Sequence, residues 1–119
     1  MKTLVGIVLL GMTLAVTGCA SDSNQAEEGV IEVEAVDHKF VPDELDAEAG
    51  SISFAIRNTG QEIHEFEVFE GKKLIDEVED ISPGLTRELT VSLEAGTYEY
   101  ACKFEDHYER GMKGTLTVT

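Results

Sequence analysis

Hydrophobic and polar residues alternate along most of the chain from Val30 onward. Apolar side chains occupy every second position in short runs, which is the pattern of a β-strand with one buried face. The clearest runs are Ile31, Val33 and Ala35; Ile52, Phe54 and Ile56; His64, Phe66 and Val68; Leu85, Leu89, Val91 and Leu93; Tyr98, Tyr100 and Cys102; and Leu116 and Val118. No segment carries a convincing apolar stripe of helical period. The pattern therefore predicts an all-β domain.

Turn signals separate these runs at short intervals. They are Ala49-Gly50, Asn58-Thr59-Gly60, Glu70-Gly71, Pro83-Gly84 and Ala95-Gly96. Short alternating strands with regular glycine-containing turns are typical of an antiparallel β-sandwich or barrel. The stretch 103–113 is irregular and is predicted to be a loop between two strands. We expect one small domain over residues 30–119.

The first residues have the composition of a secretory signal. An uncharged apolar run, Leu4 to Val16, follows Lys2 and is shorter than the roughly 20 residues that span a bilayer. The next residues, Val16-Thr17-Gly18-Cys19, resemble the bacterial lipobox, which implies that Cys19 is acylated. We expect a lipoprotein signal peptide at 1–18 and a lipidated flexible tether at 19–29. An ordinary signal cleaved elsewhere nearby is the alternative.

A lipid on Cys19 would place the protein in the bacterial cell envelope, on the periplasmic side of a membrane. Ala20 and Ser21 follow the cysteine without an aspartate. This order resembles outer-membrane sorting in a Gram-negative cell, so the outer membrane is favoured if the cell is of that kind.

The formal net charge of −15 excludes recognition of nucleic acid, because phosphate binding needs the opposite sign. Such a charge suits a basic docking face on a partner, or a protein at high salt, although it often reflects only a solvated surface. We expect a monomer.

Four side chains with metal-binding capacity are predicted to meet at one end of the sandwich. His64 begins a strand, Cys102 ends another strand, and His107 and Met112 lie on the loop that follows Cys102. If Cys19 is lipidated, Cys102 has no disulfide partner in an oxidising compartment, so it is either simply buried or occupied. Each residue alone has an ordinary structural role, but their joint occurrence favours a metal site.

Two histidines, a cysteine and a weakly bound methionine are the ligands of copper in electron-transfer sites. The sequence HEFEV at His64 is not an HExxH zinc motif, and the chain contains no CxxC. The predicted cofactor is therefore one copper ion, cycling between Cu(II) and Cu(I).

The segment GTYEYACKFEDHYERGMKGTLTV, residues 96–118, resembles the C-terminal signature of the cupredoxins, including the spacing Cys-x4-His-x4-Met. The segments NTGQEIHEFEV and FVPDELDAEAGSISFAIRN resemble the preceding strands of that family. The resemblance implies a cupredoxin-like Greek-key β-sandwich of about seven or eight strands, with copper held by His64, Cys102, His107 and Met112. It also implies that Asn58 or a nearby backbone amide supports the thiolate.

Residues 58–93 look still more like the cupredoxin-like domain of EfeO-type periplasmic iron-uptake proteins. Many of those domains lack the complete copper set that this chain has, and many of those proteins carry a large helical domain for which this chain has no room. We therefore expect a one-electron carrier rather than an enzyme, with a redox protein or a metal transporter as its partner. The alternatives are a module that delivers copper or iron, and an oxidase of ferrous iron, which a single copper disfavours because it moves only one electron.

Overall fold

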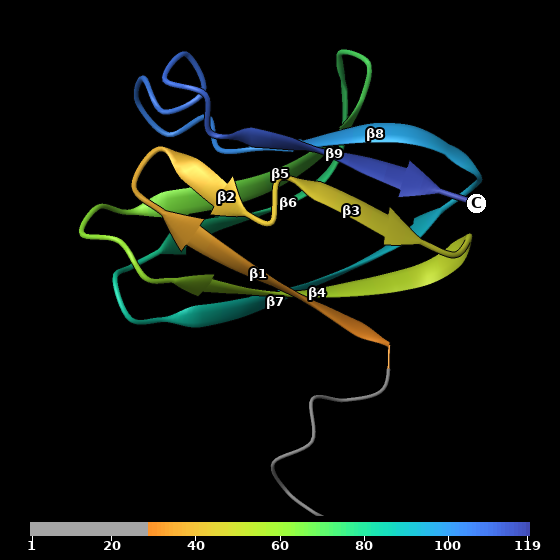
Figure 1. The fold of residues 1–119 in the computed structure, drawn as a ribbon, viewed down its shortest axis with the longest axis horizontal. Coiled ribbons are helices and arrows are strands. Elements are labelled where there is room, and N and C mark those ends of the chain that lie inside the picture. The colour runs from red at the N-terminus through yellow and green to blue at the C-terminus, as the bar shows by residue number, and fades with distance from the viewer. Residues whose placement is uncertain (1–28) are drawn as a thin grey trace, which may run out of the picture.

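The computed structural model describes residues 29–119, which form a sandwich of two β-sheets (Figure 1). The strands of this part are β1 (Val30–Val36), β2 (Lys39–Val41), β3 (Glu44–Ala47), β4 (Gly50–Asn58), β5 (His64–Glu70), β6 (Lys73–Ile81), β7 (Thr86–Leu93), β8 (Gly96–Ala101) and β9 (Lys113–Val118). The predicted all-β sandwich is confirmed, and β2, β3 and β6 are strands that the clearest alternating runs did not include. The predicted signal, Cys19 and the tether up to residue 28 lie outside the described residues.

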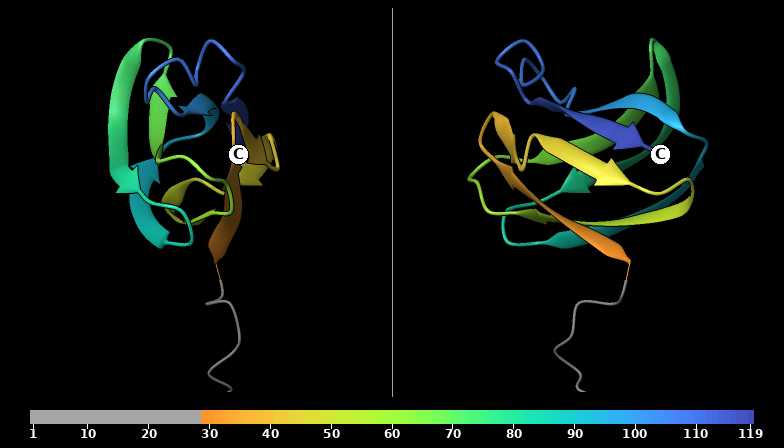
Figure 2. Two further views of the ribbon diagram at one scale, coloured as in Figure 1. Left: turned by 90° about the vertical axis from the view of Figure 1, so that its left-hand side faces the viewer. Right: turned by 45° about the vertical axis from the view of Figure 1, so that its right-hand side comes forward.

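The two sheets face each other across the core (Figure 2). One sheet has the order β2-β1-β4-β7, and the other has the order β3-β9-β8-β5-β6. Most neighbouring strands are antiparallel, but β1 pairs in parallel with β4, and β3 pairs in parallel with β9. The antiparallel pairing predicted from the alternation therefore holds for most strand pairs but is wrong for these two. Because the chain crosses repeatedly from one sheet to the other, it can return beside an earlier strand in the same direction.

Aromatic side chains fill the centre of the sandwich. Phe66 of β5 stacks on Tyr100 of β8, with ring centroids 5.5 Å apart, and Phe54 of β4 contacts Phe66 from the opposite sheet at 5.2 Å. All three are fully buried. Burial of such rings is a large hydrophobic contribution to folding. Leu85, predicted to point inward with the β7 residues, is 45% exposed instead, since it precedes the strand.

A close approach between β8 and β9 depends on Gly114. A Cβ atom at this position would overlap the ring of Tyr100. The Tyr100 hydroxyl donates a hydrogen bond of 2.7 Å to the carbonyl oxygen of Pro42, just before β3. One buried side chain therefore ties three segments of the second sheet together.

Three connections meet at one end of the sandwich, at the left in Figure 1. They are the β1–β2 turn at residues 37–38, the β4–β5 loop at 59–63, and the β8–β9 loop at 102–112. The Asn58 side-chain amide donates hydrogen bonds of 2.7 Å to the carbonyl oxygens of Glu62 and Ile81. Asn58 thus fixes the middle connection to the end of β6. Within residues 29–119, no helix is long and apolar enough to cross a bilayer.

Candidate metal centre

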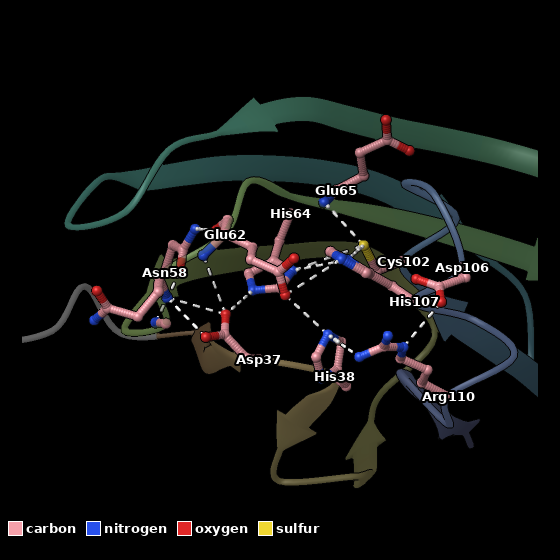
Figure 3. A network of polar contacts seen from close by, with 12 residues as sticks. Asp37, His38, Asn58, Glu62, His64, Glu65, Cys102, Asp106, His107 and Arg110 are labelled. Carbon is pink, nitrogen blue, oxygen red and sulfur yellow. Dashed lines mark hydrogen bonds and ion pairs between the residues drawn. The ribbon is translucent and has the colours of Figure 1, made fainter.

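The structure brings His64, Cys102 and His107 together at this end of the sandwich (Figure 3). His64 is the first residue of β5, and Cys102 directly follows β8, which is the antiparallel neighbour of β5. His107 lies in the middle of the β8–β9 loop. All three residues are fully buried.

Three donor atoms of these residues point toward one another. The two Nδ1 atoms of His64 and His107 are 3.3 Å apart, and the Sγ of Cys102 lies 3.5 Å from Nδ1 of His107 and 4.0 Å from Nδ1 of His64. A metal at the centre of a trigonal N₂S set, with bonds of about 2.0–2.1 Å to nitrogen and about 2.3 Å to sulfur, would separate the donors by roughly 3.5–3.8 Å. The donor spacing thus fits a single small metal ion.

Met112, the fourth ligand that the sequence predicted, lies at the end of the same loop. It is fully buried in the core cluster that also contains Cys102. Its backbone N–H donates to the carbonyl oxygen of His107, and its carbonyl oxygen accepts from the N–H of Cys102, both at 3.0 Å. These bonds close the loop and fix the three residues relative to one another. Together with His64, these three residues form a site that resembles a type 1 copper site. Copper is therefore the cofactor that fits the site.

The backbone surrounds the thiol of Cys102 with hydrogen-bond donors. The N–H of Glu65 donates to Sγ at 3.3 Å. Burial raises the pKa of the Cys102 thiol, and the backbone amides of Glu65 and Phe104 oppose this shift. The expectation that a backbone amide supports the sulfur is therefore met by Glu65. The Asn58 side chain does not serve this role, because it is bonded within the β4–β5 loop.

The second ring nitrogen of His64 contacts Asp37. Nε2 of His64 lies 3.0 Å from Oδ1 of Asp37. The Asp37 carboxylate also accepts hydrogen bonds from the N–H groups of Gln61 and Glu62, and the bond from Gln61 is the main reason that its pKa is lowered. Burial lowers the pKa of His64, which favours the neutral ring that a metal requires. Asp37 thus orients one imidazole ligand.

The outer side of His107 is covered by His38 and Glu62 (Figure 3). His38 Nε2 is 2.8 Å from Glu62 Oε2 and 3.2 Å from a guanidinium nitrogen of Arg110, and Arg110 pairs in turn with Asp106. Sequence reasoning gave His38 no function and did not single out Asp37 or Glu62. Nothing in the local pattern marks them, because only the fold places the β1–β2 turn against the β4–β5 loop.

Among the acidic residues near the site, Glu67 is buried. It is only 7% exposed, and its Oε2 atom has no hydrogen-bond partner. Burial, together with the neighbouring carboxyl groups of Glu77 and Glu65, raises the pKa of Glu67 to about 7. Glu105 and Glu109, by contrast, are exposed.

Comparison with known proteins gives the same picture of the fold. A family model described as a cupredoxin-like domain matches residues 6–118. Among solved structures, the reduced auracyanin of Roseiflexus castenholzii superposes with a TM-score of 0.71 at 21% identity, over 76% of this chain and 97% of that one. Auracyanin A of Chloroflexus aurantiacus, a blue copper protein, gives 0.69 at 22%, over 76% and 98%. At this identity the likeness concerns the fold.

Sequence relatives include a component of iron uptake systems. The chain is 30% identical to the iron uptake system component EfeO of Yersinia pestis over 119 residues, which are 99% of this chain and 29% of that protein. It is also 30% identical to EfeO of Escherichia coli K12 over 80 residues, 67% of this chain and 21% of that protein. The chain thus spans less than a third of the length of these relatives. With the family match over most of its length, the chain belongs to the family of cupredoxin-like domains.

Proposed function

We propose that this protein is a one-electron carrier with a type 1 copper centre. His64, Cys102 and His107 would hold the copper as its three strong ligands, and Met112 would be the weaker axial ligand. The observation that carries this proposal is the convergence of two Nδ1 atoms and one Sγ atom, 3.3–4.0 Å apart and wholly buried. Bound copper supplies the chemistry, a reversible exchange of one electron between Cu(II) and Cu(I).

The protein residues contribute a fixed geometry. His64 is held by Asp37, Cys102 by the N–H of Glu65, and the β8–β9 loop by its own backbone bonds. A frame of this kind changes little between two oxidation states of a metal, which lowers the structural rearrangement on electron transfer. Burial of the three donors also limits the access of water and oxygen. The role is that of a carrier without catalytic turnover.

A second candidate function is the binding and delivery of copper or iron. The observation in its favour is the 30% identity to proteins named as components of iron uptake systems. Rapid exchange of the metal, or binding of Cu(I) without a stable Cu(II) form, would favour delivery over electron transfer. The partner would be a redox protein in the first case and a metal transporter in the second, and the negative charge of the chain suits a basic docking face on either.

We further propose an exported protein that a lipid on Cys19 anchors at the periplasmic side of a bacterial membrane. The support for this part comes from the sequence of residues 1–29. A short apolar run leads into Val16-Thr17-Gly18-Cys19, and an acidic, polar stretch precedes the folded domain.

The optical spectrum of the Cu(II)-loaded protein tests the copper site. We expect an intense visible band that ascorbate bleaches, because the Cys102 thiolate would donate charge to Cu(II). Cys102→Ser should abolish this band, since an alcohol does not replace a thiolate ligand. The proposal would be wrong if the spectrum of Cys102→Ser were unchanged. It would also be wrong if the wild type showed only the weak bands of ordinary Cu(II).

The axial position is tested separately through Met112→Leu. Leucine fills a similar volume but offers no sulfur, so folding and the thiolate band should persist. The reduction potential should shift, because the axial ligand tunes it. Voltammetry of both proteins measures this shift. Equal potentials would show that Met112 only packs the core.

A further inference from the structure

A second group of donor atoms lies on the outer side of His107. Nε2 of His38, a carboxylate oxygen of Glu62 and a ring nitrogen of His107 all lie within 4.8 Å of one another. The closest pair is His38 Nε2 and Glu62 Oε2 at 2.8 Å, and His107 Nε2 is 3.7 Å from the same oxygen. The side chains of His38 and Glu62 are 27% and 44% exposed, so solvent reaches the group from one side.

His107 contributes a buried nitrogen without a partner. Its Nδ1 points toward Cys102 and His64, whereas its Nε2 is buried and makes no hydrogen bond. The 3.7 Å that separate Nε2 from Glu62 exceed the length of a hydrogen bond. An unsatisfied buried nitrogen costs free energy, and native structures usually pair such atoms. The ring therefore presents an unused donor atom to Glu62 and His38.

His38 has two partners that no single state of a neutral ring satisfies. If Nε2 carries a proton, it donates to Glu62 but opposes the N–H of Arg110; if it carries a lone pair, it accepts from Arg110 but opposes the carboxylate. A cation placed between His38, Glu62 and His107 removes the repulsion between the lone pair of His38 Nε2 and the Glu62 carboxylate. Each of the three donor atoms then offers a lone pair to the cation. Arg110 is the competing positive charge, and its side chain is 54% exposed and able to turn outward.

The β1–β2 turn and the β4–β5 loop hold His38 and Glu62 of this group in place. Asp37 accepts the N–H groups of Gln61 and Glu62, which fixes the β4–β5 loop beneath the Glu62 side chain. His38 follows Asp37 in the β1–β2 turn with a φ of 66°, a conformation uncommon for residues other than glycine. One turn thus orients His64 through Asp37 and directs His38 toward Glu62 (Figure 3).

We propose that His38, Glu62 and Nε2 of His107 form a second metal site, for a divalent ion of the zinc class. Two imidazole nitrogens and one carboxylate oxygen, with a position open to solvent, are a common ligand set for Zn²⁺. The His107 ring is shared, with Nδ1 directed to the copper site and Nε2 to the second ion. As the bond to Nε2 forms in the copper-loaded protein, the ring releases its remaining N–H proton to solvent.

Titration of the Cu(II)-loaded protein with Zn²⁺ tests this site by calorimetry, by metal analysis and by the visible band. The wild type should take up one Zn²⁺ in addition to copper, and the band should shift without loss of copper. His38→Gly, which tolerates the positive φ, and Glu62→Gln should each weaken zinc binding about tenfold or more while the copper band persists. Arg110→Gln should strengthen zinc binding, because it removes the competing charge.

Two further variants separate this site from its neighbours. Glu105→Gln is the matched control, because Glu105 and Asp106 form another candidate group with His107, and its zinc affinity should equal that of the wild type. Cys102→Ser removes the thiolate but none of the three zinc donors. Zinc binding should persist in Cys102→Ser and disappear when His38→Gly is added, and this result would stand even if the protein did not bind copper.

Three results would overturn the second site. The first is no uptake of zinc by either the copper-loaded protein or Cys102→Ser. The second is uptake that is unaffected by His38→Gly and Glu62→Gln. The third is zinc that only displaces copper, with no binding in Cys102→Ser that depends on His38. Circular dichroism of each variant would show that a loss of zinc binding does not reflect unfolding.

Discussion

At the scale of single residues, Asp37 is the side chain on which the geometry of the site most depends. Its carboxylate contacts Nε2 of His64 and accepts hydrogen bonds from the backbone N–H groups of Gln61 and Glu62. Asp37 therefore joins the proposed ligand His64 to the β4–β5 loop, which precedes His64 in the chain. Gly60 makes this arrangement sterically possible. A Cβ atom at position 60 would overlap the Asp37 carboxylate.

Gly60→Ala should therefore push Asp37 away from His64. We expect a loss of about 1–3 kcal/mol in the free energy of unfolding, as for other overpacked sites, and a changed visible band in the Cu(II) form. Chemical denaturation and optical spectra measure the two effects. Gly96→Ala is the matched control, because its added Cβ would meet the Tyr98 ring at an ordinary 3.7 Å. Equal behaviour of the two variants would contradict the role given to Gly60.

At the scale of elements, the pairing of β5 with β6 brings carboxyl groups together on the outer face of the second sheet. Glu67 stands opposite Glu77 in the register, and Glu65 lies two residues before Glu67 on the same face of β5. Burial and these neighbours raise the pKa of Glu67 from 4.5 to about 7. In the folded protein this carboxyl group thus holds its proton at pH values where it would be ionised in the unfolded chain.

The consequence is a stability that falls as the pH rises. Between about pH 4.5 and 7 the folded protein binds more protons at Glu67 than the unfolded chain does. The contribution of Glu67 to the free energy of unfolding is therefore fully present below pH 4.5 and is lost as the pH rises through 7. Glu67→Gln should remove this part of the pH dependence. It should also stabilise the apo protein at pH 8 by about 3 kcal/mol, because the pKa rises from 4.5 to about 7 and each pKa unit corresponds to about 1.36 kcal/mol.

Urea unfolding at pH 5 and pH 8 measures the effect. Glu70→Gln on the same strand is the control, because Glu70 is exposed. If the wild type and Glu67→Gln lost the same free energy of unfolding between the two pH values, Glu67 would not be the cause of the pH dependence.

At the scale of the whole molecule, β1 runs the length of the sandwich, from Val30 at one end to the turn at residues 37–38 at the other end. The metal end of the sandwich therefore lies away from the start of β1 (Figure 1). If Cys19 is lipidated, the chain enters the domain at the end remote from copper. That arrangement would leave the copper end free to meet a partner.

Cys19→Ser should move the expressed protein from the membrane fraction to the soluble fraction, because the proposed acyl chains on Cys19 would provide the anchor. Fractionation of cells and mass spectrometry of the mature N-terminus measure the change. Cys102→Ser should stay in the membrane fraction, which separates the effect of the lipid from the effect of a lost cysteine. A wild-type protein without lipid, or one found only in the soluble fraction, would exclude the anchor.

The sequence alone was sufficient for those features that depend on local pattern. Alternation of apolar and polar residues predicted six of the nine strands of residues 29–119, all except β2, β3 and β6, because the side chains of a strand point to opposite faces in turn. The positions of His64, Cys102, His107 and Met112 at strand ends and on one loop predicted that they would converge. Three of these four belong to one short segment, so little of the tertiary structure was needed to bring them together.

Only the tertiary structure decided which distant segments lie around those ligands. The parallel pairing of β1 with β4 places the β1–β2 turn beside the β4–β5 loop, and this brings Asp37 to His64 and His38 to Glu62. The burial of Glu67 likewise depends on the register between β5 and β6. Alternation along the chain carries no information on strand order or register, because these are set by packing between segments far apart in sequence.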